Sequence, residues 1–194
     1  MRVIAGTQRG RRLMAPRSAA IRPTADRVRE ALFSILGDRV REARVLDLFA
    51  GTGAVGLEAL SRGARHVTFV ESGRAALGLL RANLHRCGAA ASAEVRPCSV
   101  AAFFRRRSEG LAPYDLVFAD PPYAPAAGIR VLEALDRSAA VTVGTTVVLE
   151  HATRLPSPAR VGSLIRTRQY RYGDTMLSVY YRALGPTVEE NREI

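Results

Sequence analysis

The feature that most constrains the fold is an apolar segment that runs directly into a glycine turn, Val45-Leu46-Asp47-Leu48-Phe49-Ala50-Gly51-Thr52-Gly53. A short apolar run that ends in glycines, with a helical pattern after it, is typical of a buried strand in a parallel sheet. We therefore predict a strand over Arg44–Phe49, a turn over Gly51–Gly53 and a helix over Ala54–Arg62. The turn glycines let the backbone approach a ligand, and the start of the helix offers unpaired N–H groups.

The same alternation of strand and helix continues along the chain. Further strands are predicted over His66–Glu71, Ser92–Pro97, Tyr114–Ala119, Thr145–His151, Ser163–Tyr172 and Thr175–Arg182, and helices over Arg74–Cys87, Val100–Arg107 and Ile129–Arg137. This order predicts an α/β fold with right-handed crossovers. Because the last two strands join tightly at Gly173-Asp174, one antiparallel strand is expected at the edge. The expected architecture is Rossmann-like, with a mostly parallel seven-stranded sheet.

A small extension precedes the first buried strand. Two short apolar pieces around Gly6–Gly10 predict a hairpin, and Thr24 is placed to cap a helix over Ala25–Leu36 that Gly37 ends. The chain is accordingly divided into an N-terminal basic extension (1–37), an α/β catalytic domain (38–185) and a tail (186–194).

The charge of the chain favours a polyanionic partner. The sequence has 29 Lys+Arg against 18 Asp+Glu, for a net charge of +11, and every basic residue is Arg. Residues 1–44 alone hold 11 Arg and 4 acidic residues, a net of +7 (11 − 4). A solvated basic face is the simpler reading, but clustering beside an α/β domain favours a nucleic-acid contact. Guanidinium groups also suit phosphate, because they donate two parallel hydrogen bonds.

Two carboxylates next to the glycine turn indicate which cofactor it takes. The pattern Gly51-x-Gly53-x-x-Gly56 also satisfies the dinucleotide fingerprint, so an NAD-dependent oxidoreductase is an alternative. Asp47, at the end of the strand, would repel a pyrophosphate but would accept hydrogen bonds from an ammonium group. Glu71 ends the next strand, where a carboxylate can bind ribose hydroxyls. Singly, Asp47 could be a buried capping residue and Glu71 an ordinary charge; together they favour S-adenosylmethionine.

The segment Asp120-Pro121-Pro122-Tyr123 follows the fourth strand, at the edge where open sheets bind ligands. Two prolines stiffen the loop and leave the Pro121 carbonyl free to accept, while Tyr123 offers a flat face to a base swung out of its stack. Acceptors around an aromatic amine favour the pyramidal nitrogen that attacks a methyl group. The pattern predicts a class I S-adenosylmethionine-dependent methyltransferase, although a packed Asp-Pro-Pro turn would look the same.

Asp rather than Asn at position 120 favours guanine as the base. Guanine presents two adjacent donors, N1–H and the N2 amine, which one carboxylate could accept together. Adenine and cytosine present a ring acceptor beside the amine, which a carboxylate would repel. A second chemistry is disfavoured: Pro97-Cys98 follows the third strand rather than the fourth, so Cys98 is not expected to be a ring-carbon methylase nucleophile.

Several segments together resemble the bacterial RsmD family. The similar segments are Arg2–Gly6, Arg9–Leu13, Arg22–Phe33, Asp47–Gly53, Asp120–Tyr123 and Tyr172–Thr175, so the resemblance covers nearly the whole chain. It implies methylation of guanine N2 in 16S rRNA of the small ribosomal subunit. Ser99-Val100 departs from the family, whose members often have Asp or Asn followed by Ala there.

The resemblance and the sequence patterns give one set of expected site residues. Asp120, Pro121, Pro122 and Tyr123 are expected to be catalytic; Thr24, Asp47, Phe49, Gly51, Gly53, Glu71 and Ser99 to bind the cofactor; and Arg9, Arg11, Arg12, Arg22 and Arg27 to bind RNA. No metal site, signal peptide or membrane span is indicated, so we expect a cytoplasmic monomer. The remaining alternatives are a DNA amino-methylase, which would usually need a larger target-recognition region, and a nucleic-acid-binding module without catalysis.

Overall fold

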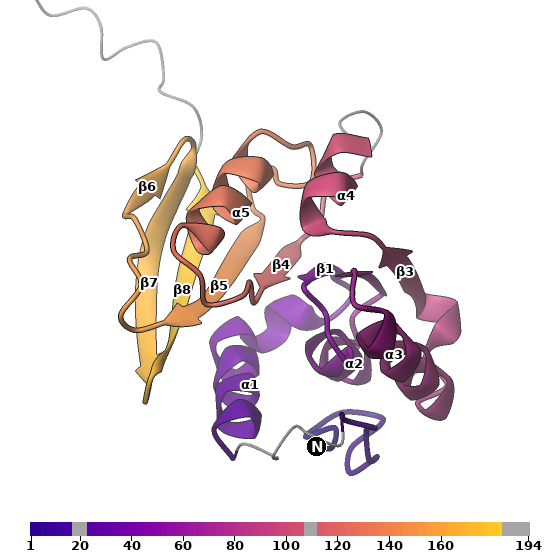
Figure 1. The fold of residues 1–194 in the computed structure, drawn as a ribbon. Helices are drawn as coiled ribbons and strands as arrows, with labels where there is room; N and C mark the ends of the chain where they lie inside the picture. The colour runs from indigo at the N-terminus through magenta and orange to yellow at the C-terminus, as the bar shows by residue number, and fades with distance from the viewer. Residues whose placement is uncertain (17–22, 107–111, 184–194) are drawn as a thin grey trace, which may run out of the picture.

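The computed structural model describes residues 1–16, 23–106 and 112–183 (Figure 1). Its elements are α1 (Pro23–Leu36), η1 (Gly37–Val40), β1 (Arg44–Leu48), α2 (Ala54–Ser61), β2 (His66–Glu71), α3 (Arg74–Arg86), η2 (Ala90–Ser92), β3 (Ala93–Pro97), α4 (Val100–Arg106), β4 (Leu116–Ala119), α5 (Ala127–Asp136), β5 (Thr146–Ala152), β6 (Arg160–Val161), β7 (Leu164–Tyr172) and β8 (Thr175–Arg182). The predicted helices and the seven predicted strands are present, with ends that differ by at most two residues.

The strands form one sheet in the order β3-β2-β1-β4-β5-β8-β7-β6. The first five are parallel, whereas β8 runs antiparallel to both β5 and β7. The predicted class, a mostly parallel α/β sheet with an antiparallel edge, is confirmed. The sheet has eight strands instead of the predicted seven, because β6 is a two-residue strand and too short to leave an alternating pattern in the sequence.

Helices cover both faces of the sheet, with α1, α2 and α3 on one side and α4 and α5 on the other (Figure 1). Two clusters of buried apolar side chains fill the spaces between the layers. Four of the five residues of β1 are buried. A central strand is buried on both faces, so its sequence is a continuous apolar run instead of an alternating one. No helix in the described part of the chain is long and apolar enough to span a membrane.

The N-terminal segment packs against the same core. Its two apolar pieces pair through a single antiparallel bridge between Arg2 and Arg12, and the side chains of Val3 and Leu13 are buried with those of α1, α2 and α3. The division at residue 37 stays a prediction, since the core continues across it.

Glu58 of α2 fastens this segment to the domain. Its fully buried carboxylate accepts hydrogen bonds from the backbone N–H groups of Ile4 (2.7 Å) and Ala5 (2.9 Å). It also pairs with the Nε atoms of Arg62 at 2.8 Å and of Arg29, on α1, at 3.8 Å. One carboxylate therefore ties together the first residues of the chain, α1 and α2.

The start of α1 differs from the prediction. The helix begins at Pro23, so Thr24 lies in its first turn and is not the residue before it. Proline is favourable at the first helical position, because its fixed φ suits the helix and its missing N–H would have no partner there. Gly37 ends the helix as predicted, with a φ of +55°. Arg22, the side chain of Thr24 and the tail 186–194 lie outside the described residues.

Candidate active site

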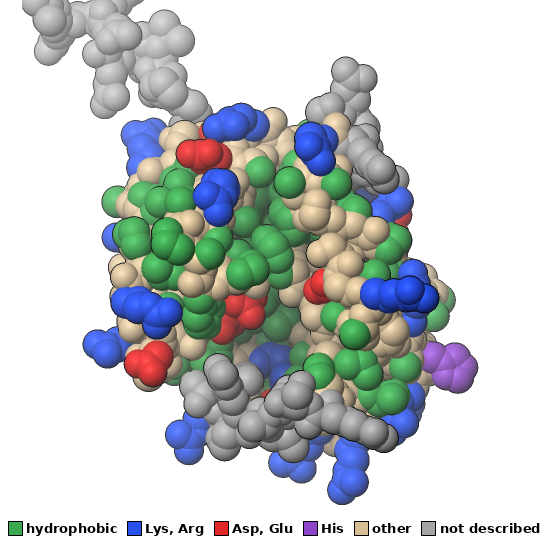
Figure 2. All heavy atoms as spheres, in the orientation of Figure 1, with side chains coloured by type: hydrophobic (Ala, Val, Ile, Leu, Met, Phe, Trp, Pro, Cys, Tyr) green, Lys and Arg blue, Asp and Glu red, His purple; other side chains and the backbone are tan. Residues whose placement is uncertain are grey.

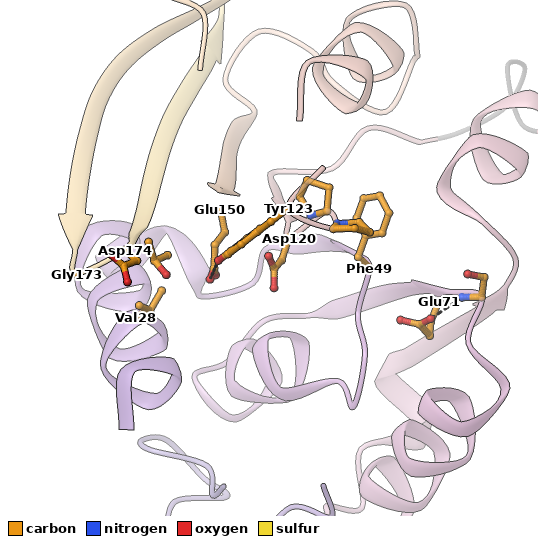
Figure 3. Close-up of a pocket in the computed structure, with 12 residues that line it drawn as sticks. Val28, Phe49, Glu71, Asp120, Tyr123, Glu150, Gly173 and Asp174 are labelled. Carbon is orange, nitrogen blue, oxygen red and sulfur yellow. Dashed lines mark hydrogen bonds between the residues drawn. The ribbon is translucent and has the colours of Figure 1, made fainter. Parts of the chain in front are cut away.

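The carboxyl ends of the central parallel strands meet at one edge of the sheet, and a pocket of about 820 Å³ opens there (Figure 3). Pockets for small molecules usually measure about 300–1,000 Å³. Glu71 lies at one end of the pocket, whereas Val28, Tyr123 and Glu150 lie toward the other. The lining residues are Val28, Phe49, Glu71, Ser72, Asp120, Pro121, Pro122, Tyr123, Glu150, Gly173, Asp174 and Thr175.

The pocket is acidic although the chain is strongly basic. Glu71, Asp120, Glu150 and Asp174 line it, and no arginine does so among the described residues. Figure 2 shows acidic side chains within this hollow face and basic ones around its rim. Such a lining attracts a cationic ligand and repels phosphate groups. The arrangement therefore argues against a dinucleotide, whose pyrophosphate would lie against these carboxylates.

The turn after β1 has a backbone that few residues adopt. Phe49, Gly51 and Gly53 have φ angles of +61°, +56° and +81°. Glycine adopts such angles without cost, whereas a non-glycine residue such as Phe49 is uncommon there. The turn directs Phe49 into the pocket. A Cβ atom on Gly53 would lie 2.3 Å from Cδ1 of Leu80, so a larger residue would also have to displace this leucine.

Asp47 lies beneath the turn and not on the pocket surface. It is almost fully buried, and its Oδ2 accepts a hydrogen bond from the N–H of Gly56 in the first turn of α2 at 3.0 Å. Burial raises the pKa of Asp47 to about 7, the Gly56 bond opposes this shift, and Asp120 and Glu71 add to it. The position matches the capping alternative, so direct contact with the cofactor stays a prediction.

Glu71 joins the turn to the end of β2. Its Oε2 accepts from the N–H of Gly51 at 2.8 Å, and its Oε1 accepts from Ser72 (2.8 Å) and Gly73 (2.6 Å). A carboxylate has about four acceptor positions. These three bonds hold the side chain at the pocket wall and leave acceptor capacity for a ligand hydroxyl.

Asp120 and Tyr123 face the middle of the pocket. Asp120 is exposed to the pocket, and partial loss of hydration raises its pKa to about 6. The Tyr123 hydroxyl donates to Glu150 Oε1 at 3.4 Å, while burial raises the tyrosine pKa to about 12. Among the described residues, none donates to the Pro121 carbonyl, whereas that of Pro122 accepts from Ala124 N–H at 2.6 Å. Asp120 and the Pro121 carbonyl are thus two acceptors beside an aromatic ring.

Glu150 is a pocket residue that was not predicted from the sequence. It lies near the end of β5, and since Ala119 of β4 pairs with Leu149, the next residues Asp120 and Glu150 are neighbours across the two strands. Burial and the charge of Asp120 raise the pKa of Glu150 to about 8. The available signal was an acidic residue inside an otherwise apolar strand.

Two further parts of the wall come from distant segments. Val28 of α1 lies beside the tip of the β7–β8 hairpin, where Gly173, Asp174 and Thr175 line the pocket (Figure 3). Nothing in the local sequence of either segment predicts this, because the contact depends on where β8 inserts in the sheet.

Ser99 is not among the pocket residues. It is exposed at the start of α4, where its Oγ accepts from the N–H of Ala102 at 3.2 Å. A serine directly before a helix usually plays this capping role. The predicted contact with adenine stays untested, and the bond that the structure shows for this hydroxyl is local.

The described arginines predicted to bind RNA are all exposed. Arg9 and Arg27 line a second hollow of about 340 Å³ with Arg2, between the N-terminal segment and α1. Arg11 donates to the carbonyl of Arg86, and Arg12 lies in the bridge to Arg2. Asp26 and Glu30 also line the second hollow, so its charge is mixed.

Comparisons with known proteins identify a matching family and similar relatives. The model of the family described as "Conserved hypothetical protein 95" matches residues 1–181. The chain is 33% identical over 180 residues to YlbH of Bacillus subtilis, provisionally named an rRNA methyltransferase, covering 93% of this chain and 98% of the relative. It is 43% identical over 123 residues to Ribosomal RNA small subunit methyltransferase D of Escherichia coli K12, covering 63% of this chain and 60% of the relative.

The solved structures agree with this result. The structure of YhhF from Escherichia coli, provisionally named a methyltransferase, superposes on the chain with a TM-score of 0.83 at 33% sequence identity. The superposition covers 94% of this chain and 97% of the other.

Proposed function

The chain belongs to the family described as "Conserved hypothetical protein 95", the RsmD family of rRNA methyltransferases, and we propose that it methylates the exocyclic N2 of one guanine in 16S rRNA. The proposed reaction is a direct in-line transfer of the methyl group, with the small ribosomal subunit as substrate. The proposal rests mainly on the position of Asp120, which lies at a strand end beside the ring of Tyr123 in an acidic pocket.

The residues of the pocket fit S-adenosylmethionine, the cofactor of these enzymes. It supplies an electrophilic methyl group on a positively charged sulfur. Glu71 would hold the ribose hydroxyls with its remaining acceptor capacity, and the turn at Phe49 and Gly51 would lie against the ligand. Asp47 would act mainly by fixing that turn from below. The acidic lining favours a cation over a dinucleotide.

Asp120 and the carbonyl of Pro121 would accept hydrogen bonds from the amine of the target base. This orients the nitrogen lone pair and opposes its delocalisation into the ring, which otherwise makes the amine a poor nucleophile. Tyr123 would stack on the base after it leaves the helix. Its bond to Glu150 would hold the ring in place.

A carboxylate at position 120 supports guanine over the other amino bases. At neutral pH Asp120, with its pKa near 6, is mostly ionised and accepts only. Guanine offers N1–H and N2–H side by side to such a group, whereas adenine and cytosine offer an acceptor next to the amine. Efficient methylation of an RNA with adenine in place of the target guanine would contradict this assignment.

The direct test is transfer of labelled methyl from S-adenosylmethionine to small ribosomal subunits that lack their guanine-N2 methylation. We expect label in N2-methylguanine at a single site. Label in another base would overturn the guanine assignment, and label in DNA alone would replace the substrate class. Protein-free 16S rRNA, assayed in parallel, distinguishes an assembled particle from naked RNA as substrate.

Replacing Glu71 with alanine is expected to weaken binding of S-adenosylhomocysteine by about 10- to 100-fold, because hydrogen bonds to a charged group contribute about 1.5–3 kcal/mol. Calorimetric titration measures this affinity directly. The matched control is Glu94→Ala on the neighbouring strand β3, since Glu94 does not line the pocket. Equal affinities of the two variants would remove Glu71 from the cofactor site.

A further inference from the structure

A second group of arginines lies in the last part of the described chain. Residues 153–183 contain six Arg and a single acidic residue, Asp174, a net charge of +5 (6 − 1). Arg166 and Arg182 donate to backbone carbonyls within the domain. The other four are exposed: Arg154, Arg160, Arg168 and Arg171. Among the described residues, none of these four forms an ion pair with a carboxylate.

Two of the exposed arginines are held next to the pocket. The N–H of Thr153, which precedes Arg154, donates to the carbonyl of Asp174 at 2.9 Å. The Nε of Arg171 donates to the carbonyl of Gly173 at 3.1 Å. Since Gly173 and Asp174 line the pocket, both arginines extend from the segments that build its wall.

This wall belongs to the end of the pocket where the base is proposed to lie. The hairpin tip, Val28 and Glu150 lie together there, away from Glu71 (Figure 3). Arg27 directly precedes Val28 on α1, and it lines the second hollow with Arg2 and Arg9. Figure 2 shows basic side chains on the rim both at the β7–β8 side and below the pocket.

We propose that the tip of the β7–β8 hairpin, through Arg171, and the adjoining end of β5, through Arg154, form a second binding surface for RNA phosphates, in addition to the predicted N-terminal arginines. This rests on the proposed RNA substrate. A base that leaves its stack costs a few kcal/mol of stacking and pairing energy. Phosphate contacts next to the pocket would offset that cost. Guanidinium groups that pair with no carboxylate of the described residues suit phosphate, because they can donate in a bidentate manner.

The expected size of the effect follows from counterion release. Each phosphate contact with single-stranded nucleic acid contributes about 0.7 to the slope of log affinity against log salt. At 0.1 M salt, one lost contact therefore weakens binding roughly 5-fold and two roughly 25-fold. The log–log slope itself should become shallower by about 1.4.

The test compares the double variant R154Q/R171Q with R160Q. Arg160 is a matched control, because it is also exposed and its Nε also donates to a glycine carbonyl two residues later, that of Gly162, at 3.0 Å. Arg160 pairs with Ile165 of β7, which is six residues before Arg171, so Arg160 lies roughly 20 Å along the strand from Arg171.

Affinity for a single-stranded 16S rRNA fragment is measured by fluorescence anisotropy from 50 to about 300 mM salt, a range over which phosphate contacts give a linear log–log plot. We expect the roughly 25-fold loss and the shallower slope in R154Q/R171Q alone, with S-adenosylhomocysteine affinity and melting temperature equal to wild type. Methylation of subunits should show a raised KM and an unchanged kcat.

Equal slopes for wild type and R154Q/R171Q would overturn the inference. An effect on intact subunits without an effect on the RNA fragment would also overturn it, since the hairpin would then contact a ribosomal protein. If the wild-type chain methylates subunits and R154Q/R171Q binds RNA equally well, only the proposed second RNA-binding surface is wrong. If the wild-type chain binds no RNA and methylates no subunits, the proposed RNA substrate itself is wrong.

Discussion

Replacing Asp120 with alanine is expected to lower the rate of methyl transfer by about 10²- to 10³-fold, the usual effect of removing one positioned polar group from a transition state. Affinity for S-adenosylhomocysteine should stay close to wild type, because Asp120 is proposed to contact the base. Single-turnover methylation of small subunits and calorimetric titration measure the two quantities. The control is Asp115→Ala at the other end of β4, where the carboxylate accepts from Arg44 N–H.

The same residue should set the acid limb of the pH profile. Its pKa is raised to about 6, so the accepting carboxylate is lost as the pH falls through that value. The rate should therefore decline below about pH 6 in the wild type. Asp120→Asn should be slow at every pH and should lack this limb. Retained activity in Asp120→Ala would show that another group accepts from the base. An unchanged acid limb in Asp120→Asn would assign that limb to another titrating group.

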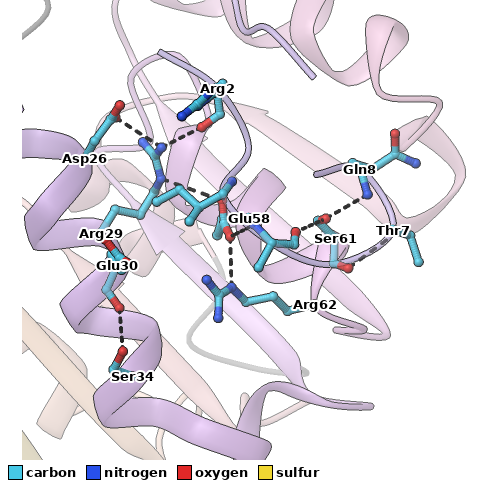
Figure 4. Close-up of polar contacts among 12 residues, drawn as sticks. Arg2, Thr7, Gln8, Asp26, Arg29, Glu30, Ser34, Glu58, Ser61 and Arg62 are labelled. Carbon is cyan, nitrogen blue, oxygen red and sulfur yellow. Dashed lines mark hydrogen bonds and ion pairs between the residues drawn. The ribbon is translucent and has the colours of Figure 1, made fainter. Parts of the chain in front are cut away.

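Replacing Glu58 with alanine should have the largest effect on stability. The change leaves the backbone N–H groups of Ile4 and Ala5 without their acceptor and removes a carboxylate that pairs with Arg29 and Arg62 (Figure 4). Breaking a buried pair by removing one partner costs about 3–5 kcal/mol. For a chain of this size, that corresponds to a melting temperature lower by about 6–20 °C.

The matched control is Glu133→Ala, which removes an exposed carboxylate that pairs with Arg137 at 3.4 Å at helical spacing. Such pairs contribute only about 0.3–0.5 kcal/mol. Differential scanning calorimetry of both variants compares the stability lost with a buried ion pair and with an exposed one. If Glu58→Ala and Glu133→Ala have similar melting temperatures, the N-terminal segment is not held by the Glu58 carboxylate.

The sequence by itself determined the features that are local in the chain. The glycine turn after β1 and the Asp120–Tyr123 segment are contiguous, so their chemistry is visible in a few letters. The strands were recognisable because helices cover both faces of the sheet, which makes each central strand a continuous apolar run. The fold class and the cofactor were therefore predictable, and so was the edge of the sheet that carries the site.

Only the tertiary structure decided how distant segments meet. Glu150 joins Tyr123 because β5 pairs with β4 in a particular register, and the hairpin tip reaches the pocket because β8 inserts between β5 and β7. Strand order and register depend on packing between segments far apart in the chain, which local periodicity does not encode. Tertiary structure also decided the partner that Asp47 has within the chain, the N–H of Gly56, while its contact with the cofactor stays a prediction.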